Sequence, residues 1–200
     1  TVTYAKDEQV ITYRYEESHI GIIADKRWDF GKHDTTGTDR NYYLKAKTKD
    51  NQKQPYAVSV EDYYTSKGWT LNVKQDDQFH TNANEKIAGD QKFLDNAVLN
   101  FHNGQIVLKE SDDVGATAPV SKVTSEFELT PKGAAVNLMT HTNKTPDPGY
   151  YAAHGFGIWA YQFGDAQQAD YSIGLKVLKA TKRFPRQYTS QLTWSLVIAE

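Results

Sequence analysis

Two Trp-x-Leu triplets contain the side chains best suited to recognition chemistry in this sequence. The first is Trp69-Thr70-Leu71 and the second is Trp194-Ser195-Leu196. An exposed indole ring offers an apolar face on which a sugar ring or a peptide can stack. A buried indole instead fills the core, where truncation costs on the order of 3–5 kcal/mol. The residues alone leave both interpretations open: a ligand platform and a structural core.

Aromatic and acidic residues precede the first triplet. Asp62 is followed by Tyr63 and Tyr64, and a second aromatic stretch joins Tyr150-Tyr151 to His154 and Trp159. Either group could line a saccharide groove, and the alternative is ordinary packing at strand ends. The candidate ligand-binding residues are therefore Trp69, Leu71, Trp194, Leu196, Asp62, Tyr63 and Tyr64.

A short segment near the C-terminus carries five cations and no acid, which predicts a secondary basic patch for an anionic polymer. The alternative is a solvated loop between strands. The patch comprises Lys176, Lys179, Lys182, Arg183 and Arg186.

The sequence gives little support for catalysis. It contains no cysteine, which excludes disulfides, thiolate metal sites and a cysteine nucleophile. Its six histidines lack metal-binding spacing, and the acidic pairs Asp76-Asp77 and Asp112-Asp113 point to opposite faces if they lie on strands. We therefore expect a binding protein with no cofactor and no metal rather than an enzyme.

Charge and hydropathy limit the partners. The net charge of −2 does not suit a nucleic-acid-binding polycation. The longest apolar stretches, such as Ile20–Ile23, are too short to span a bilayer. We expect neither nucleic acid nor a membrane span.

Period-2 alternation of apolar and polar residues recurs along the chain and predicts short strands. Asn103-Gly104 predicts a hairpin between its flanking strands, because a type I′ turn favours this pair. Pro131–Gly133 predicts another turn, Thr48–Pro55 is a turn-rich polar stretch, and Phe93–Ala97 is the best helix candidate, with barely one turn. The predicted strands are 10–15, 19–24, 41–47, 56–61, 68–75, 97–102, 105–110, 122–129, 134–140, 156–163, 172–178 and 187–199.

This pattern predicts an all-β fold, a sandwich or a barrel-like domain with ten or more short strands and little helix. We expect residues 1–200 to form one domain, with exposed loops at Ser111–Pro119 and Thr142–Gly149. Both triplets place Trp and Leu on the apolar side of an amphipathic strand. We also expect the two triplets to lie close together in space.

The ordered motifs of this chain resemble those of the WxL domain family of Gram-positive cell surfaces. An aromatic-Asp-Phe-Gly step matches Trp28–Gly31, and the step Gly-Trp-Thr-Leu-x-Val matches Gly68–Val73. Phe79 follows, and a Leu-x-x-Ala-x-Leu-x-Phe segment matches Leu94–Phe101. The last strand matches Tyr188–Leu196, so the resemblance covers residues 20 to 200.

The resemblance implies a secreted, non-catalytic domain that attaches non-covalently to the cell wall, with peptidoglycan as the expected ligand. It also implies association with other surface proteins encoded at the same locus. A protein-interaction or adhesin role, directed at partner surface proteins or host matrix, is the alternative function.

Overall fold

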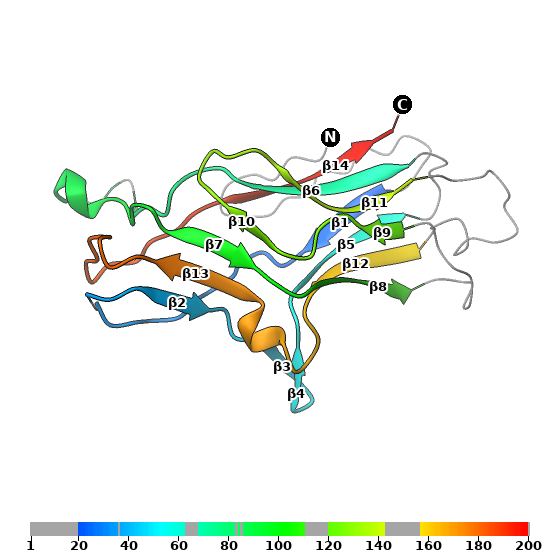
Figure 1. The fold of residues 1–200 in the computed structure, drawn as a ribbon, viewed down its shortest axis with the longest axis horizontal. Helices are drawn as coiled ribbons and strands as arrows, with labels where there is room; N and C mark the ends of the chain where they lie inside the picture. The colour runs from blue at the N-terminus through cyan, green and yellow to red at the C-terminus, as the bar shows by residue number, and fades with distance from the viewer. Residues whose placement is uncertain are drawn as a thin grey trace, which may run out of the picture.

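The described part of the chain is nearly all β. The computed structural model describes residues 20–35, 37–62, 68–82, 84, 86–110, 120–142 and 157–199. These residues form fourteen strands, and every strand pair is antiparallel (Figure 1). The expected all-β fold with little helix is confirmed. The expected strand at Val10–Tyr15 and the expected loop at Ser111–Pro119 lie outside the described residues. Of the other expected loop, Thr142–Gly149, only Thr142 is described.

Two four-stranded sheets face each other in one half of the molecule (Figure 1). At both sides of this pair, edge strands lie beside one another, β1 beside β14 and β8 beside β9, so the sandwich is barrel-like. The first sheet contains, in spatial order, β1 (Ile20–Ala24), β5 (Ala57–Asp62), β12 (Gly157–Phe163) and β8 (Gly104–Glu110). The second contains β14 (Leu192–Ile198), β6 (Trp69–Gln75), β11 (Val136–His141) and β9 (Val120–Lys122).

A third four-stranded sheet, here the end sheet, extends the molecule to one side. Its spatial order is β10 (Phe127–Leu129), β7 (Val98–Phe101), β13 (Ile173–Val177) and β2 (Arg40–Tyr43). Its inner face is apolar and its outer face polar, because residues along each strand alternate between the faces. Two 3₁₀ turns, η1 (Gly89–Gln91) and η3 (Ala169–Tyr171), are the only helical elements of the described residues.

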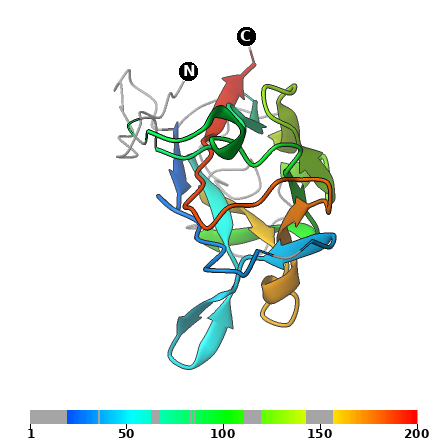
Figure 2. The same ribbon diagram turned by 90° about the vertical axis from the view of Figure 1, so that its left-hand side faces the viewer.

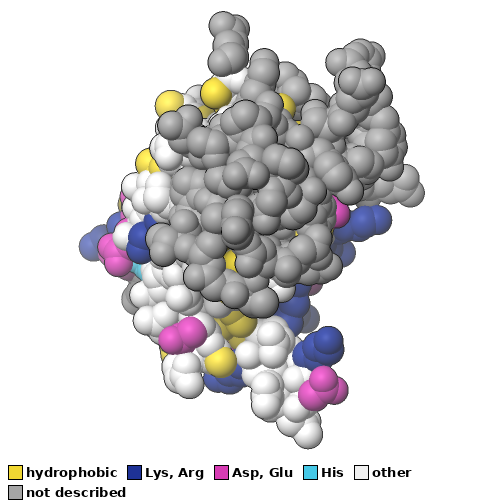
Figure 3. Space-filling model, turned by 90° about the vertical axis from the view of Figure 1, so that its right-hand side faces the viewer, with side chains coloured by type: hydrophobic (Ala, Val, Ile, Leu, Met, Phe, Trp, Pro, Cys, Tyr) yellow, Lys and Arg dark blue, Asp and Glu magenta, His cyan; other side chains and the backbone are white. Residues whose placement is uncertain are grey.

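A small hairpin of β3 (Lys47–Lys49) and β4 (Gln52–Gln54) projects from the body. All its residues are exposed, and charged side chains of both signs occupy it (Figure 3). Its turn residues Asp50 and Asn51 have φ of 50° and 60°, as a type I′ turn requires. The chain therefore makes a tight hairpin within the predicted polar stretch, and the predicted strand 41–47 divides into β2 and the start of β3.

One hydrophobic core joins the three sheets. Its largest fully buried side chains include Trp69 and Leu71 of β6, Tyr161 and Phe163 of β12, and Phe101 of β7. The ring of Phe101 packs against those of Phe163 and Trp28, at 5.4 and 6.2 Å between centroids. Aromatic packing thus links the end sheet to the sandwich.

The predicted hairpin at Asn103-Gly104 is wrong. Asn103 does have a positive φ of 58°, but β7 pairs with β10 and β13 while β8 pairs with β12. The chain crosses here from the end sheet into the sandwich. Gly104 is needed for a close approach, because a Cβ at this position would overlap the Tyr161 hydroxyl.

The other local predictions have mixed outcomes. The turn at Pro131–Gly133 is confirmed by the bond from Gly133 N–H to Thr130 O, at 2.9 Å. The helix candidate at Phe93–Ala97 is wrong, since Phe93 forms an antiparallel bridge to His80 and a turn follows. The bridge explains the failure: tertiary pairing overrides a weak local helical pattern.

Candidate functional site

The two triplets lie on neighbouring strands, as the sequence predicts. Strand β14 pairs with β6, so Leu196 lies opposite Leu71 and Ile198 opposite Trp69. Paired residues of an antiparallel ladder share a face, which directs both tryptophans and both leucines toward the core. Trp69 is 1% exposed and Trp194 3%. Their burial agrees with the structural interpretation of the triplets.

Asp62 and Trp69 join the two sheets of the sandwich. Asp62 ends β5, Trp69 begins β6, and the indole Nε1–H donates to Asp62 Oδ2 at 2.7 Å. Asp62 is fully buried, and the ring of His141 lies 5.9 Å from that of Trp69. Asp62, Trp69 and Leu71 are all buried, so in the described structure none of them presents a surface to a ligand. Tyr63 and Tyr64 lie outside the described residues, as do Tyr150, Tyr151 and His154.

A cleft of about 730 Å³ lies between the end sheet and the sandwich. Figure 2 faces the end of the molecule where the segments after β1, after β6 and before β14 come together. Leu99, Leu175 and Val177 on the inner face of the end sheet contribute apolar lining. Segment 25–35 and segment 183–194 provide most of the remaining lining. We name this cavity the end cleft.

Trp28 is the central aromatic residue of the end cleft. Its ring makes edge contacts with Trp194, Tyr56 and Phe163, with centroids 6.0, 5.8 and 5.8 Å apart. Its Nε1–H is buried without a hydrogen-bond partner among the described residues. Trp194 also lines the cleft, so one tryptophan of the two triplets reaches this cavity. The aromatic lining is Trp28, Phe30, Tyr42, Phe79, Phe184, Tyr188 and Trp194.

Several residues that carry the family resemblance line this one cavity although they are far apart in sequence. Trp28–Gly31, Phe79, Leu94, Leu99 and Tyr188 are among them. The motifs of the family resemblance therefore supply residues both to the lining of the end cleft and to the hydrophobic core.

Hydrogen bonds centred on Asp77 fix one wall of the end cleft. Its Oδ1 accepts from Gln191 N–H at 2.9 Å and from the Ser190 hydroxyl at 3.3 Å. Its Oδ2 lies 3.0 Å from His80 Nε2, and His80 Nδ1 lies 2.8 Å from Thr81 O. Both histidine nitrogens are thus engaged away from Ser190. These bonds hold that side of the end cleft in place. They do not include a hydrogen bond between Ser190 and His80, which an activated serine nucleophile would need.

Three of the five residues of the predicted basic patch line two different cavities. Arg183 and Arg186 line the end cleft, whereas Lys176 lines a separate depression on the outer face of the end sheet. Arg183 Nη2 donates to the carbonyls of Thr38, Val177 and Leu178, and Lys182 pairs with Asp90 at 3.0 Å. Arg183 therefore links the loop before β2 to the end of β13 through hydrogen bonds.

Sequence reasoning missed most of the cleft lining. Phe184 and His80 carry no local signal of their own, because the cavity forms only when three distant segments meet. Within the described residues, no group of three or more His, Asp or Glu side chains could hold a metal ion. No helix among them is long and apolar enough to cross a membrane.

The described residues form an all-β fold with an aromatic-lined cleft, and concave, largely apolar clefts are where proteins commonly bind ligands. A family model described as "WxL domain surface cell wall-binding" matches residues 15–199. The chain belongs to the WxL domain family and is a cell-wall-binding domain of the cell surface. No curated protein and no solved structure matched the chain.

Proposed function

We propose that this domain attaches to the cell wall by binding peptidoglycan in the end cleft. The observation that carries the proposal is the cleft itself, about 730 Å³ of aromatic-lined space. Aromatic faces suit the C–H surfaces of sugar rings, and a few placed polar groups orient a bound molecule. Asp29, Gln187 and Thr189 at the lining are exposed and supply such groups.

The charge of the cleft favours a ligand without strong net charge. Its ionisable lining, histidines aside, is balanced, with four cations and four anions. A polyanion would gain little from such a surface, whereas a glycan with its peptide stem needs no net attraction. The cations are Lys26, Arg27, Arg183 and Arg186, and the anions are Asp25, Asp29, Asp34 and Asp77.

Pelleting with washed peptidoglycan sacculi tests the proposal. Phe184→Ala removes a half-buried aromatic ring from the lining, and we expect it to weaken binding by about tenfold, the effect of losing one stacking contact. Phe93→Ala is the matched control, because Phe93 is 45% exposed and lies outside the lining. Equal binding of the two variants would contradict the cleft as the site.

Ionic strength separates this mechanism from attraction to anionic polymers. Binding in the charge-balanced cleft should persist when salt is raised, because screening acts on net electrostatic attraction. A steep loss of pelleting between low and high salt would assign wall attachment to the exposed cations instead.

The proposal includes three further points. The protein is exported, it acts by binding rather than catalysis, and residues 1–200 fold as one domain. Release of soluble fragments from purified wall polysaccharide would contradict the second point.

One observation favours the alternative function, assembly with partner surface proteins. Among the described residues strand β14 is the edge of its sheet, beside but not paired with β1, and Val197 and Ile198 on it are 58% and 39% exposed. Such an edge can accept a strand from another protein. Size-exclusion mixing with a surface protein of the same locus tests it, and separate elution at micromolar concentration would count against it.

A further inference from the structure

A glycine in the middle of the end sheet makes room for a pair of amides. Gly174 lies on β13 between Asn100 of β7 and Tyr43 of β2. A Cβ at Gly174 would overlap Asn100 Oδ1 and come within 2.6 Å of Asn41 Oδ1. Both amides therefore lie over this residue, on the outer face of the sheet. A glycine inside a strand weakens the strand and often marks the close approach of another group.

The two carboxamides form a reciprocal pair. Asn100 Nδ2 donates to Asn41 Oδ1 at 3.1 Å, and Asn41 Nδ2 donates to Asn100 Oδ1 at 3.5 Å. A carboxamide carries two N–H donors, and each asparagine uses one of them in this pair. The second N–H of each takes part in no hydrogen bond between described residues. Asn100 is 5% exposed and held in place, while Asn41 is exposed. Asn41 thus presents an uncommitted donor on the open sheet face, and its bonds to buried Asn100 hold it in position.

A depression of about 330 Å³ lies at the amide pair. It is lined by two cations, Arg40 and Lys176, and by two anions, Asp39 and Glu128, together with His102 and the two asparagines. The depression carries donors and acceptors but no net charge when His102 is neutral. This chemistry suits a neutral ligand with many hydroxyl groups better than an anionic or cationic one.

An aromatic shelf adjoins the amide pair on the same side of the sheet. Tyr43 is paired with Gly174, and its ring meets that of Tyr171 edge-on at 5.6 Å. Tyr171 is 59% exposed, and the ammonium of Lys45 lies 5.6 Å from the centre of its ring. An exposed tyrosine beside hydrogen-bonding groups offers a stacking face for a sugar ring.

We propose that the outer face of the end sheet is a second binding site, for a flat, neutral β-1,4-linked saccharide chain. The asparagine pair would bond to hydroxyl or acetamido groups while Tyr171 stacks on a neighbouring ring. A β-1,4 chain is a flat ribbon, which matches a sheet face better than a coiled glycan does. Leu99 and Leu175 of the same strands point to the end cleft, so this site lies on the other side of the sheet.

Chitotetraose, cellotetraose and the coiled glucan maltotetraose are the probes, and ¹⁵N-resolved NMR of the asparagine side-chain amides is the readout. We expect the Asn41 and Asn100 signals to shift with at least one β-1,4 oligosaccharide at millimolar concentration, and to respond less to maltotetraose. Tyr171→Ala and Asn41→Ala should each weaken binding by about tenfold. Asn137→Ala, at an exposed asparagine on β11, is the matched control and should bind as the wild type does.

The variants also separate this site from the end cleft. Phe184→Ala should leave the oligosaccharide-induced shifts of Asn41 and Asn100 unchanged, and a melting temperature for each variant confirms folding. The proposal is overturned if neither β-1,4 oligosaccharide shifts these signals, or if Phe184→Ala abolishes the shifts while Tyr171→Ala does not. Sacculus binding that survives in the Tyr171→Ala protein leaves the function of the cleft intact.

Discussion

The bond between Trp69 and Asp62 shows how a motif residue can matter without touching a ligand. The indole N–H reaches a fully buried carboxylate from the facing sheet at 2.7 Å. A buried acidic side chain that loses a hydrogen-bond donor is less stable in the folded state, so the bond contributes to stability. Trp69 therefore contributes to the closure of the sandwich.

Trp69→Phe should lower the free energy of unfolding by about 2–4 kcal/mol, through the lost bond and the smaller ring. Trp194→Phe is the matched control, because no side-chain hydrogen bond of Trp194 occurs among the described residues. Urea unfolding monitored by circular dichroism measures both. An equal loss in the two variants would show that the Asp62 bond contributes nothing.

At this scale the sequence predicts which way the triplet side chains face but not what they contact. Alternation placed Trp69 and Trp194 on the apolar side, and both are buried. The partner of Trp69 could not be predicted, since Asp62 belongs to another sheet and alternation carries no information across a sandwich. Trp28 was a motif residue whose contacts with Trp194 and Tyr56 depend on tertiary packing alone.

The link between β7 and β8 is the clearest case of an element that local signals misjudge. Asn103-Gly104 has the composition of a hairpin turn, yet the chain passes from one sheet to another there. Strand pairing depends on residues far apart in sequence. A pair such as Asn103-Gly104 therefore indicates only that the chain can turn there, not which strands pair. Strands β6 and β12 lie within one residue of their predicted bounds, because every second residue along each is buried in the core.

Gly104→Ala should destabilise the protein by about 1–3 kcal/mol, because the added methyl would overlap the Tyr161 hydroxyl. Tyr161 cannot easily move, since its hydroxyl donates to Thr124 O at 2.8 Å and the ring is buried. Burial also raises the pKa of Tyr161, so the hydroxyl stays protonated at neutral pH. Gly37→Ala has open space around it and is the control for thermal unfolding. Equal melting temperatures would contradict the overlap.

The β3–β4 hairpin is held at its base by an ion pair that should respond to acid. Lys53 Nζ lies 2.5 Å from Asp170 Oδ2, and this bond, with one from Ala46 N–H, lowers the pKa of Asp170. A lowered carboxylate pKa means that the contribution exists above the unfolded pKa, about 3.9, and is lost as pH falls through the folded one. The pKa of Lys53 is raised, mainly by the same bond, so its contribution persists until strongly basic pH.

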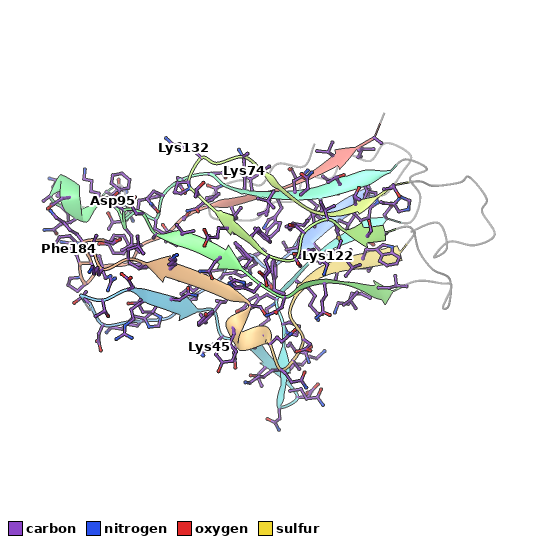
Figure 4. All side chains as sticks on the ribbon, in the orientation of Figure 1. Lys45, Lys74, Asp95, Lys122, Lys132 and Phe184 are labelled. Carbon is purple, nitrogen blue, oxygen red and sulfur yellow. The ribbon has the colours of Figure 1, made fainter. Side chains whose placement is uncertain are left out.

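Asp170→Asn should therefore loosen the hairpin at pH 7, with little difference from the wild type once Asp170 is protonated. Heteronuclear NOE values of the hairpin amides at pH 7 and near pH 2.5 measure this. Asp95→Asn, at an exposed acid at the far end of the molecule, is the control (Figure 4). A hairpin that stays equally rigid in Asp170→Asn at pH 7 would show that the anchor is unimportant.

At the scale of the whole molecule, three sheets share one core and enclose one principal cleft. The all-β class follows from strand-favouring composition and alternation, so it could be predicted. The cleft could not, because it requires the end sheet and the two segments after β1 and before β14 to be placed relative to one another. The same holds for the basic patch, of which Arg183 and Arg186 line the end cleft and Lys176 lines a depression on the outer face of the end sheet.

A shared core predicts one cooperative unfolding transition. Trp28 and Trp194 lie at the junction of the end sheet and the sandwich, so their fluorescence should change together with the circular dichroism of the strands. Two separated transitions in denaturant would contradict the proposal that the chain folds as one domain.

The central claim is that the end cleft receives the wall ligand, and NMR of the four indole N–H signals tests it most directly. On addition of soluble peptidoglycan fragments, we predict shifts for Trp28 and Trp194, which line the cleft, while Trp69 stays fixed by its bond to buried Asp62. Fragment binding that leaves the Trp28 and Trp194 signals unmoved would place the ligand elsewhere and contradict the account.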